Sequence, residues 1–139
     1  MMGMSEKNSL EVAEELAKEY HEGQTRRDGE PYVSHPLSVA QKLKGNKERI
    51  VGTLHDILED TEITEEELKK HFTKDIVETV KLLTKEDGQD YLKYLKKVKE
   101  NELARKVKIA DMKHNLNDNP TQKQVKKYTK GLKILEERQ

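Results

Sequence analysis

The segment Gly52–Thr61, which reads GTLHDILEDT, combines a helical apolar pattern with side chains that could carry out chemistry. Its apolar residues recur at the spacing of a helix face that packs against a core: Leu54, Ile57 and Leu58. Four ionisable residues stand among them: His55, Asp56, Glu59 and Asp60. Because burying ionised groups is costly, a helix with a buried face needs a reason to carry so many of them.

A bound cation would supply that reason, and two further residues could join His55 and Asp56 around it. His35 stands at the start of a predicted helix, and Asp111 follows an apolar pair in the sequence KIAD. Four such ligands would fill a tetrahedral zinc site, whereas six-coordinate manganese or iron would keep positions open for water and substrate. Alternatively, the His55–Asp56 pair is a solvated helix edge, since this dipeptide is common by chance.

Helices are predicted for all the elements that must position these residues. Apolar residues at three- and four-residue steps indicate helices over residues 10–20, 34–43, 47–61, a short stretch after Thr64, 73–83, 91–98, 103–112 and 121–135. Ser34 and Pro36 are expected to start the second helix, Gly45 to end it, and Thr64 with Glu67 to form a capping box. No segment alternates with period two, so we expect one all-α domain over residues 1–139.

Composition limits the functional classes. The 139 residues include 27 basic and 27 acidic side chains, so no net charge attracts the chain to nucleic acid or to membranes. The absence of cysteine excludes disulfides, thiolate ligands and cysteine nucleophiles. Because the N-terminus has no apolar run, we expect no signal peptide and a cytoplasmic location. The lysine-rich stretches after residues 93 and 123 are interleaved with other residue types, which favours solvated helix faces.

Four motifs occur in a fixed order along the chain: HEGQTRRDGEPYVSHP at 21–36, LHDILEDT at 54–61, LT at 83–84 and KIADMKHN at 108–115. Together they resemble the HD-superfamily hydrolase domain of the RelA/SpoT alarmone enzymes, and specifically the small stand-alone alarmone hydrolases. The resemblance extends from about residue 8 to residue 132. It implies an HD-domain helical bundle that uses a divalent cation, manganese above all, with iron, cobalt or magnesium as other candidates. It also implies hydrolysis of the 3′-pyrophosphate of guanosine 3′,5′-bis(diphosphate), ppGpp, or of pppGpp.

The resemblance implies roles for individual residues. The metal ligands would be His35, His55, Asp56 and Asp111. The acidic pair that orients and deprotonates the attacking water would be Glu59 and Asp60. The residues that contact the nucleotide would be Arg26, Arg27, Asn115 and Tyr128. Lys85 and Lys93 are the candidates for a further phosphate contact. A synthetase domain is not expected, because the chain is too short to contain one.

The remaining histidines and tyrosines receive simpler interpretations. His21, His71 and His114 are expected to be helix caps or surface residues. Tyr20, Tyr32 and Tyr91 are expected to serve only in packing. Two other functions stay open at this stage. One is hydrolysis of a different nucleotide (an adenosine alarmone, a nicotinamide dinucleotide phosphate or a simple nucleotide), and the other is non-catalytic nucleotide or protein binding.

Overall fold

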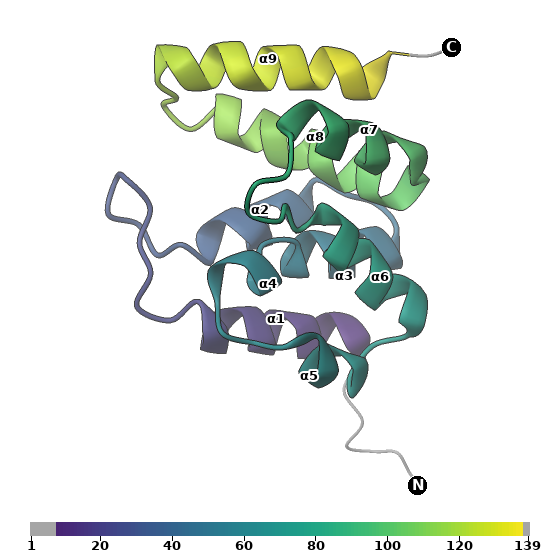
Figure 1. Ribbon diagram of the computed structural model, residues 1–139. Helices are drawn as coiled ribbons and strands as arrows, with labels where there is room; N and C mark the ends of the chain where they lie inside the picture. Colours follow the sequence, from purple (N-terminus) through teal and green to yellow (C-terminus); the bar gives the residue numbers. More distant parts are fainter. Residues whose placement is uncertain (1–7, 138–139) are drawn as a thin grey trace, which may run out of the picture.

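The structure is a computed structural model that describes residues 8–137. Within these residues the chain forms nine helices and no β-strand, which confirms the all-α prediction (Figure 1). The helices are α1 Ser9–Tyr20, α2 Ser34–Gln41, α3 Asn46–Leu54, α4 Ile57–Asp60, α5 Glu65–Lys69, α6 Lys74–Leu83, α7 Tyr91–Glu100, α8 Glu102–Leu116 and α9 Gln122–Glu136. None of the helices in the described part of the chain is long and apolar enough to cross a membrane.

Two helices, α3 and α8, lie at the centre of the bundle. Helix α3 packs against α1, α2, α6 and α8, and α8 packs in addition against α2, α6, α7 and α9. Figure 1 shows α9 above α7 and α8, with α1 and α5 on the opposite side of the molecule. The connection between α1 and α2, residues 21–33, projects from this helical body. Side chains on α3 and α8 are therefore held between several neighbouring helices.

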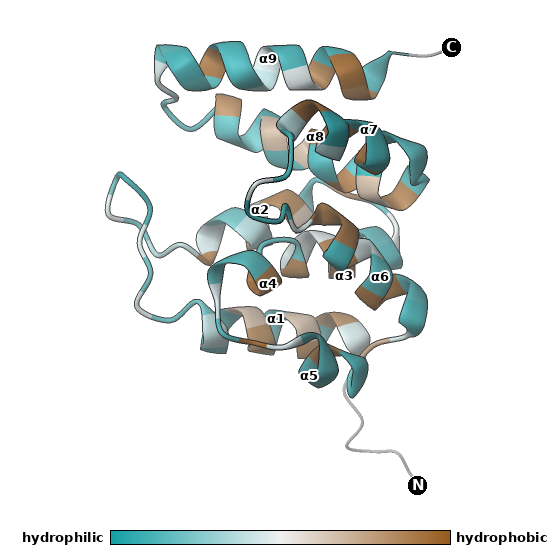
Figure 2. Cartoon of the chain, in the orientation of Figure 1, coloured by the Kyte–Doolittle hydropathy of each residue, from teal (hydrophilic) through white to brown (hydrophobic). Residues whose placement is uncertain are grey.

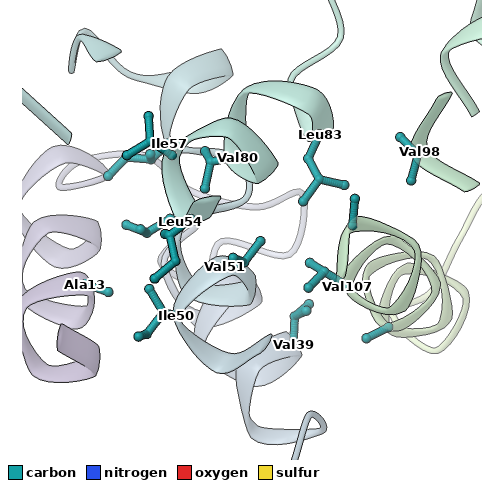
Figure 3. Packing of buried hydrophobic residues seen from close by; sticks show 14 of the residues in the cluster. Ala13, Val39, Ile50, Val51, Leu54, Ile57, Val80, Leu83, Val98 and Val107 are labelled. Atoms are coloured by element: carbon teal, nitrogen blue, oxygen red, sulfur yellow. The ribbon is translucent and has the colours of Figure 1, made fainter. Parts of the chain in front are cut away.

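The apolar faces of these helices meet in one core. Figure 2 shows hydrophobic residues on the facing sides of α1, α3 and α6, whereas much of α9 is hydrophilic. In Figure 3, Ile50, Val51 and Leu54 of α3 lie between Ala13 of α1 and Val107 of α8. All five side chains are essentially inaccessible to solvent. Full burial of a single Leu or Ile side chain stabilises a protein by about 1.5–3 kcal/mol, so this cluster fixes α3 firmly.

The helix predicted over residues 47–61 is interrupted at His55 and Asp56, which corrects the sequence prediction. The imidazole of His55 donates a hydrogen bond from Nδ1 to the carbonyl oxygen of Gly52, at 2.6 Å. In a continuous helix this carbonyl would accept the amide of Asp56, so the side chain replaces a main-chain bond. Leu54 and Ile57, on either side of the break, are both fully buried. Buried side chains before and after the break therefore fix its position in the core.

Other predicted helix ends also differ from the structure. Ser34 lies inside α2, and Val33 precedes it without a side-chain cap, so Ser34 does not cap the helix. Gly45 precedes α3 and does not end α2, which stops at Gln41. Thr64 accepts the amide of Glu67, but the reciprocal bond of a capping box is absent. These differences move helix ends by a few residues and leave the order of the helices unchanged.

Candidate active site

Three buried side chains from different helices converge at the centre of the molecule. His35 is the second residue of α2, His55 follows the last residue of α3, and Asp111 lies in α8. One potential ligand atom from each lies within 4.8 Å of the other two. Nε2 of His35 is 2.8 Å from Oδ1 of Asp111, and Nε2 of His55 is 3.3 Å from the same oxygen. Residues separated by as many as 76 positions thus share one small volume.

The fourth predicted ligand, Asp56, completes this arrangement. Its Oδ2 atom lies 3.1 Å from Nε2 of His55 and 3.7 Å from Nε2 of His35. The hydroxyl of Tyr32 donates a hydrogen bond to the same oxygen at 2.6 Å. Burial raises the pKa of Asp56, but the adjacent His55 imidazole outweighs this effect and lowers it to about 2. Asp56 therefore carries a negative charge at neutral pH.

The orientation of His55 fits a metal ligand. Its Nδ1 must carry the hydrogen that is donated to Gly52, because a carbonyl oxygen can only accept. Nε2 is buried and has no hydrogen-bond partner among the described residues. Burial lowers the pKa of His55, but the carboxylates of Asp56 and Asp111 hold it well above its usual value. A cation there would satisfy both the orphaned nitrogen and the carboxylates, and the donor set fits a divalent ion.

An open cleft of about 610 Å³ lies beside this cluster. This volume is within the range of about 300–1,000 Å³ that small-molecule sites commonly occupy. His35, Asp56 and Asp111 contribute to its wall, while His55 lies behind them. All the other predicted site residues also line the cleft: Arg26, Arg27, Glu59, Asp60, Asn115 and Tyr128. The structure therefore brings every predicted site residue to one place, although it does not test their roles.

Glu59 and Asp60 are exposed to the cleft on α4. Oε1 of Glu59 accepts the amide of Lys85 at 3.1 Å, and Oδ2 of Asp60 accepts the Tyr32 hydroxyl at 3.2 Å. Partial desolvation by the cleft walls, followed by the charge of Asp56, raises the pKa of both carboxyls. A raised pKa suits a carboxyl to accept and later release a proton.

The two arginines belong to the projecting connection between α1 and α2, and both contact the end of α8 or the turn after it. Arg26 donates from Nε to Oδ2 of Asp118 at 2.9 Å and from Nη2 to Oδ1 of Asn115 at 3.3 Å. Arg27 donates to the carbonyl oxygen of Asn119 at 2.6 Å. Arg26 is largely shielded from solvent, whereas Arg27 is exposed. Arg26 is thus the more firmly held of the two.

Three residues near the site were missed by the sequence analysis. Tyr32, expected to serve only in packing, contacts Asp56 and Asp60. His114, expected at a cap or on the surface, has its Nδ1 atom 2.8 Å from Nδ1 of His35. Lys108 donates to Oδ2 of Asp111 at 3.0 Å. Their spacing was a usable signal, since Lys108 and His114 lie one turn before and after Asp111, and Tyr32 lies three residues before His35.

Several secondary predictions have mixed outcomes. His21 ends α1 as expected of a cap, but it is 2% exposed and therefore buried, whereas His71 pairs with Glu67 near the surface. Tyr20 packs against the core as expected, but Tyr91 also lines the cleft. Of the two candidate lysines, Lys85 lines the cleft and Lys93 does not.

Comparison with known proteins defines the class first. A model of the HD-domain family matches residues 13–130, so the chain belongs to the HD-domain family. Hydrolases of this family bind divalent metal ions, in agreement with the cluster of His35, His55 and Asp111.

The chain is also similar in sequence to individual characterised proteins. The chain is 35% identical to a guanosine-3′,5′-bis(diphosphate) 3′-pyrophosphohydrolase of Aquifex aeolicus, over 77% of this chain and 17% of the relative. It is 31% identical to the bifunctional (p)ppGpp synthase/hydrolase SpoT of Escherichia coli, over 73% of this chain and 16% of the relative. The chain thus spans less than a fifth of the length of these relatives.

A solved structure of similar architecture supports the fold assignment. It is a metazoan ortholog of SpoT, described as hydrolysing ppGpp, with a TM-score of 0.74 and 23% sequence identity. The match covers 96% of this chain and 86% of that chain. At this level of identity the likeness establishes the shared fold.

Proposed function

We propose that this protein is a metal-dependent phosphohydrolase that removes the 3′-pyrophosphate of ppGpp or pppGpp. Water supplies the oxygen that bonds to the 3′-phosphorus, the bond from that phosphorus to the ribose oxygen breaks, and the products are GDP or GTP and pyrophosphate. One observation carries the proposal: two histidines and two aspartates converge in one cluster, three of them on the wall of a cleft of about 610 Å³ that is also lined by two arginines. The named sequence relatives, which align with up to 77% of this chain at 31–35% identity, support the same reaction.

We propose His35, His55, Asp56 and Asp111 as the residues that would hold the cation. When bound, a divalent ion acts as a Lewis acid and lowers the pKa of water toward neutrality. Mixed imidazole and carboxylate donors suit manganese, with iron, cobalt or magnesium as further candidates. Nδ1 of His55, which donates to the Gly52 carbonyl, keeps Nε2 available for this purpose.

Proton transfer is assigned to the acidic pair. In this proposal Glu59 or Asp60 accepts a proton from the attacking water, and their raised pKa values support that role. The single hydroxyl of Tyr32 lies 2.6 Å from Oδ2 of Asp56 and 3.2 Å from Oδ2 of Asp60, so it links the cation site to the acidic pair. The leaving ribose oxygen must gain a proton, and the carboxyl that accepted one from water can donate it to this oxygen.

Nucleotide recognition is assigned to the residues that the α1–α2 connection, the end of α8 and α9 contribute to the cleft. Arg26 and Arg27 would meet the base and the phosphates, because a guanidinium can form forked bonds to phosphate and stack on a purine. Asn115 and Tyr128 are the further proposed contacts, and both line the cleft. The family match over residues 13–130 supports one HD-type domain for the whole stretch 1–139. A cytoplasmic location stays a prediction.

A hydrolysis screen tests this function. The protein is supplied with manganese and offered ppGpp, pppGpp, the adenosine analogue of ppGpp, NADPH and simple nucleotides. Products are separated by anion-exchange chromatography. We expect pyrophosphate and GDP from ppGpp, at a kcat/KM at least tenfold above that for the adenosine analogue. Preferred hydrolysis of another nucleotide would overturn the assignment of ppGpp or pppGpp as substrate. Binding of ppGpp without turnover would overturn the proposed enzymatic function.

A further inference from the structure

His114 lies on α8 one turn after Asp111 and contacts the side chain of His35. The two Nδ1 atoms are 2.8 Å apart, and the ring centroids are separated by 4.8 Å. Two ring nitrogens at this distance share a hydrogen bond, so one of them carries the hydrogen and the other accepts it. His114 does not line the cleft, which separates it from the residues that could contact a substrate.

The environment of His35 decides which of these arrangements permits ligation. Nε2 of His35 faces the cluster, 2.8 Å from Oδ1 of Asp111 and 3.7 Å from Oδ2 of Asp56. A neutral imidazole that binds a cation through Nε2 must carry its hydrogen on Nδ1. Nδ1 of His114 must then be the acceptor, and the hydrogen of His114 must lie on its own Nε2.

We propose that His114 is a positioning residue that selects the metal-binding tautomer of His35 and fixes the orientation of its ring. This inference rests on the proposed metal centre. The two histidine ligands are then held by different acceptors. His55 donates from Nδ1 to the main-chain carbonyl of Gly52, whereas His35 donates to a side chain. Only the second acceptor can be removed by substitution.

Two substitutions separate the acceptor from the bulk of the ring. His114→Leu removes the acceptor, whereas His114→Asn keeps a carbonyl oxygen attached to the same Cγ position as Nδ1. His71→Leu is the matched control, because His71 is another histidine whose ring nitrogen pairs with a side chain, Oε2 of Glu67 at 3.2 Å, but it lies just after α5 and away from the cleft. Manganese binding is measured by titration calorimetry without nucleotide, so the result is independent of the substrate assignment.

Outer hydrogen-bond partners of metal ligands typically change affinity by about 10- to 100-fold, and we expect a loss of this size for His114→Leu. His114→Asn should bind within about threefold of the wild type, and His71→Leu should match it. The thermal unfolding of the metal-free His114→Leu protein should be close to that of the wild type, because the His114 side chain is only half-buried. If His114 had a purely structural role, His114→Leu would lower the thermal stability of the metal-free protein and leave manganese affinity largely unchanged.

Four results would overturn the proposal. Unchanged affinity in His114→Leu would remove the role of His114. Equal losses in the Leu and Asn variants would assign the effect to ring volume and not to the acceptor. In the zinc-loaded wild type, nitrogen-15 NMR should find the hydrogen of His35 on Nδ1, and finding it on Nε2 would contradict the tautomer. If the wild type bound no divalent cation, the metal centre itself would fail together with the inference.

Discussion

The two sides of the cleft are built in different ways. The side with His35, His55 and Asp111 consists of buried side chains at the ends or in the middle of helices that pack in the core. The side with Arg26 and Arg27 belongs to the projecting connection at residues 21–33, which contacts α8 and the turn after it mainly through side chains. Core packing thus fixes the proposed chemistry, whereas recognition depends on a segment that can vary with little effect on the fold.

Loss of Asp111 should have the largest effect, because it removes a ligand from the buried side. We expect Asp111→Ala to abolish stoichiometric manganese binding and turnover, while circular dichroism still shows a helical protein. Lys108, which is 16% exposed and lines the cleft, would lose its partner at 3.0 Å, and this loss should also lower the free energy of unfolding. The double variant Asp111→Ala, Lys108→Met should recover much of that stability without recovering metal. Retained metal and activity in Asp111→Ala would show that the site is assigned wrongly.

The acidic pair should separate ligation from catalysis. Glu59→Gln and Asp60→Asn keep the shape of each side chain but remove the proton acceptor. We expect initial rates to fall by about 10²- to 10⁴-fold, the usual contribution of general acid–base catalysis. Manganese affinity, followed by titration, should stay within about tenfold of the wild type. Normal rates in both variants would eliminate the proposed proton transfer, and loss of metal would move these residues into the coordination shell.

On the recognition side, the arginines should affect affinity more than chemistry. Loss of one charged contact in a partly desolvated cleft costs about 2 kcal/mol, or roughly thirtyfold in binding. We expect Arg26→Ala and Arg27→Ala to raise KM for ppGpp by about this factor and to retain manganese. Arg26 should matter more, because Asp118 and Asn115 hold its guanidinium in place. A small chromogenic phosphodiester, which lacks the base and the second diphosphate, serves as control, and equal losses on both substrates would rule out a role in recognition.

The same contrast explains which features of the structure could be predicted from the sequence. Helical periodicity was sufficient for the all-α fold, because it depends on local spacing. The acidic pair and the nucleotide contacts were instead implied by the resemblance to the RelA/SpoT hydrolase domain, which left other residues of the cleft wall, such as Tyr32 and Lys108, without a role. The break at His55 was not predictable from periodicity, since it arises when the His55 side chain takes the carbonyl of Gly52. Tyr32 and His114 were misjudged for a related reason. Local spacing indicated that both lie near proposed ligands, but the contacts that define their role join residues 24 and 79 positions apart, and no local pattern contains those contacts.

A charge pair remote from both sides of the cleft provides the smallest expected effect. Lys47 at the start of α3 and Asp75 at the start of α6 form an exposed ion pair. The hydrogen bond from Lys47, followed by that from Thr73, lowers the pKa of Asp75 to about 2 from its ordinary value of 3.8. A carboxyl whose pKa is lower in the folded protein stabilises the fold above its ordinary pKa, and this contribution is lost as pH falls through the folded value.

We therefore expect Asp75→Asn to lower the free energy of unfolding slightly at neutral pH, and the difference from the wild type to shrink between pH 3.8 and about 2. Denaturant titrations at several pH values and two salt concentrations measure it, since added salt should weaken an exposed pair. Glu78→Gln is the matched control, because Glu78 is an exposed carboxylate on the same helix. Manganese affinity and the KM for ppGpp should be unchanged in both variants. A change in either would mean that the link between α3 and α6 reaches the end of α3, where His55 stands, and that the buried side of the cleft is less independent of the surface than its packing indicates.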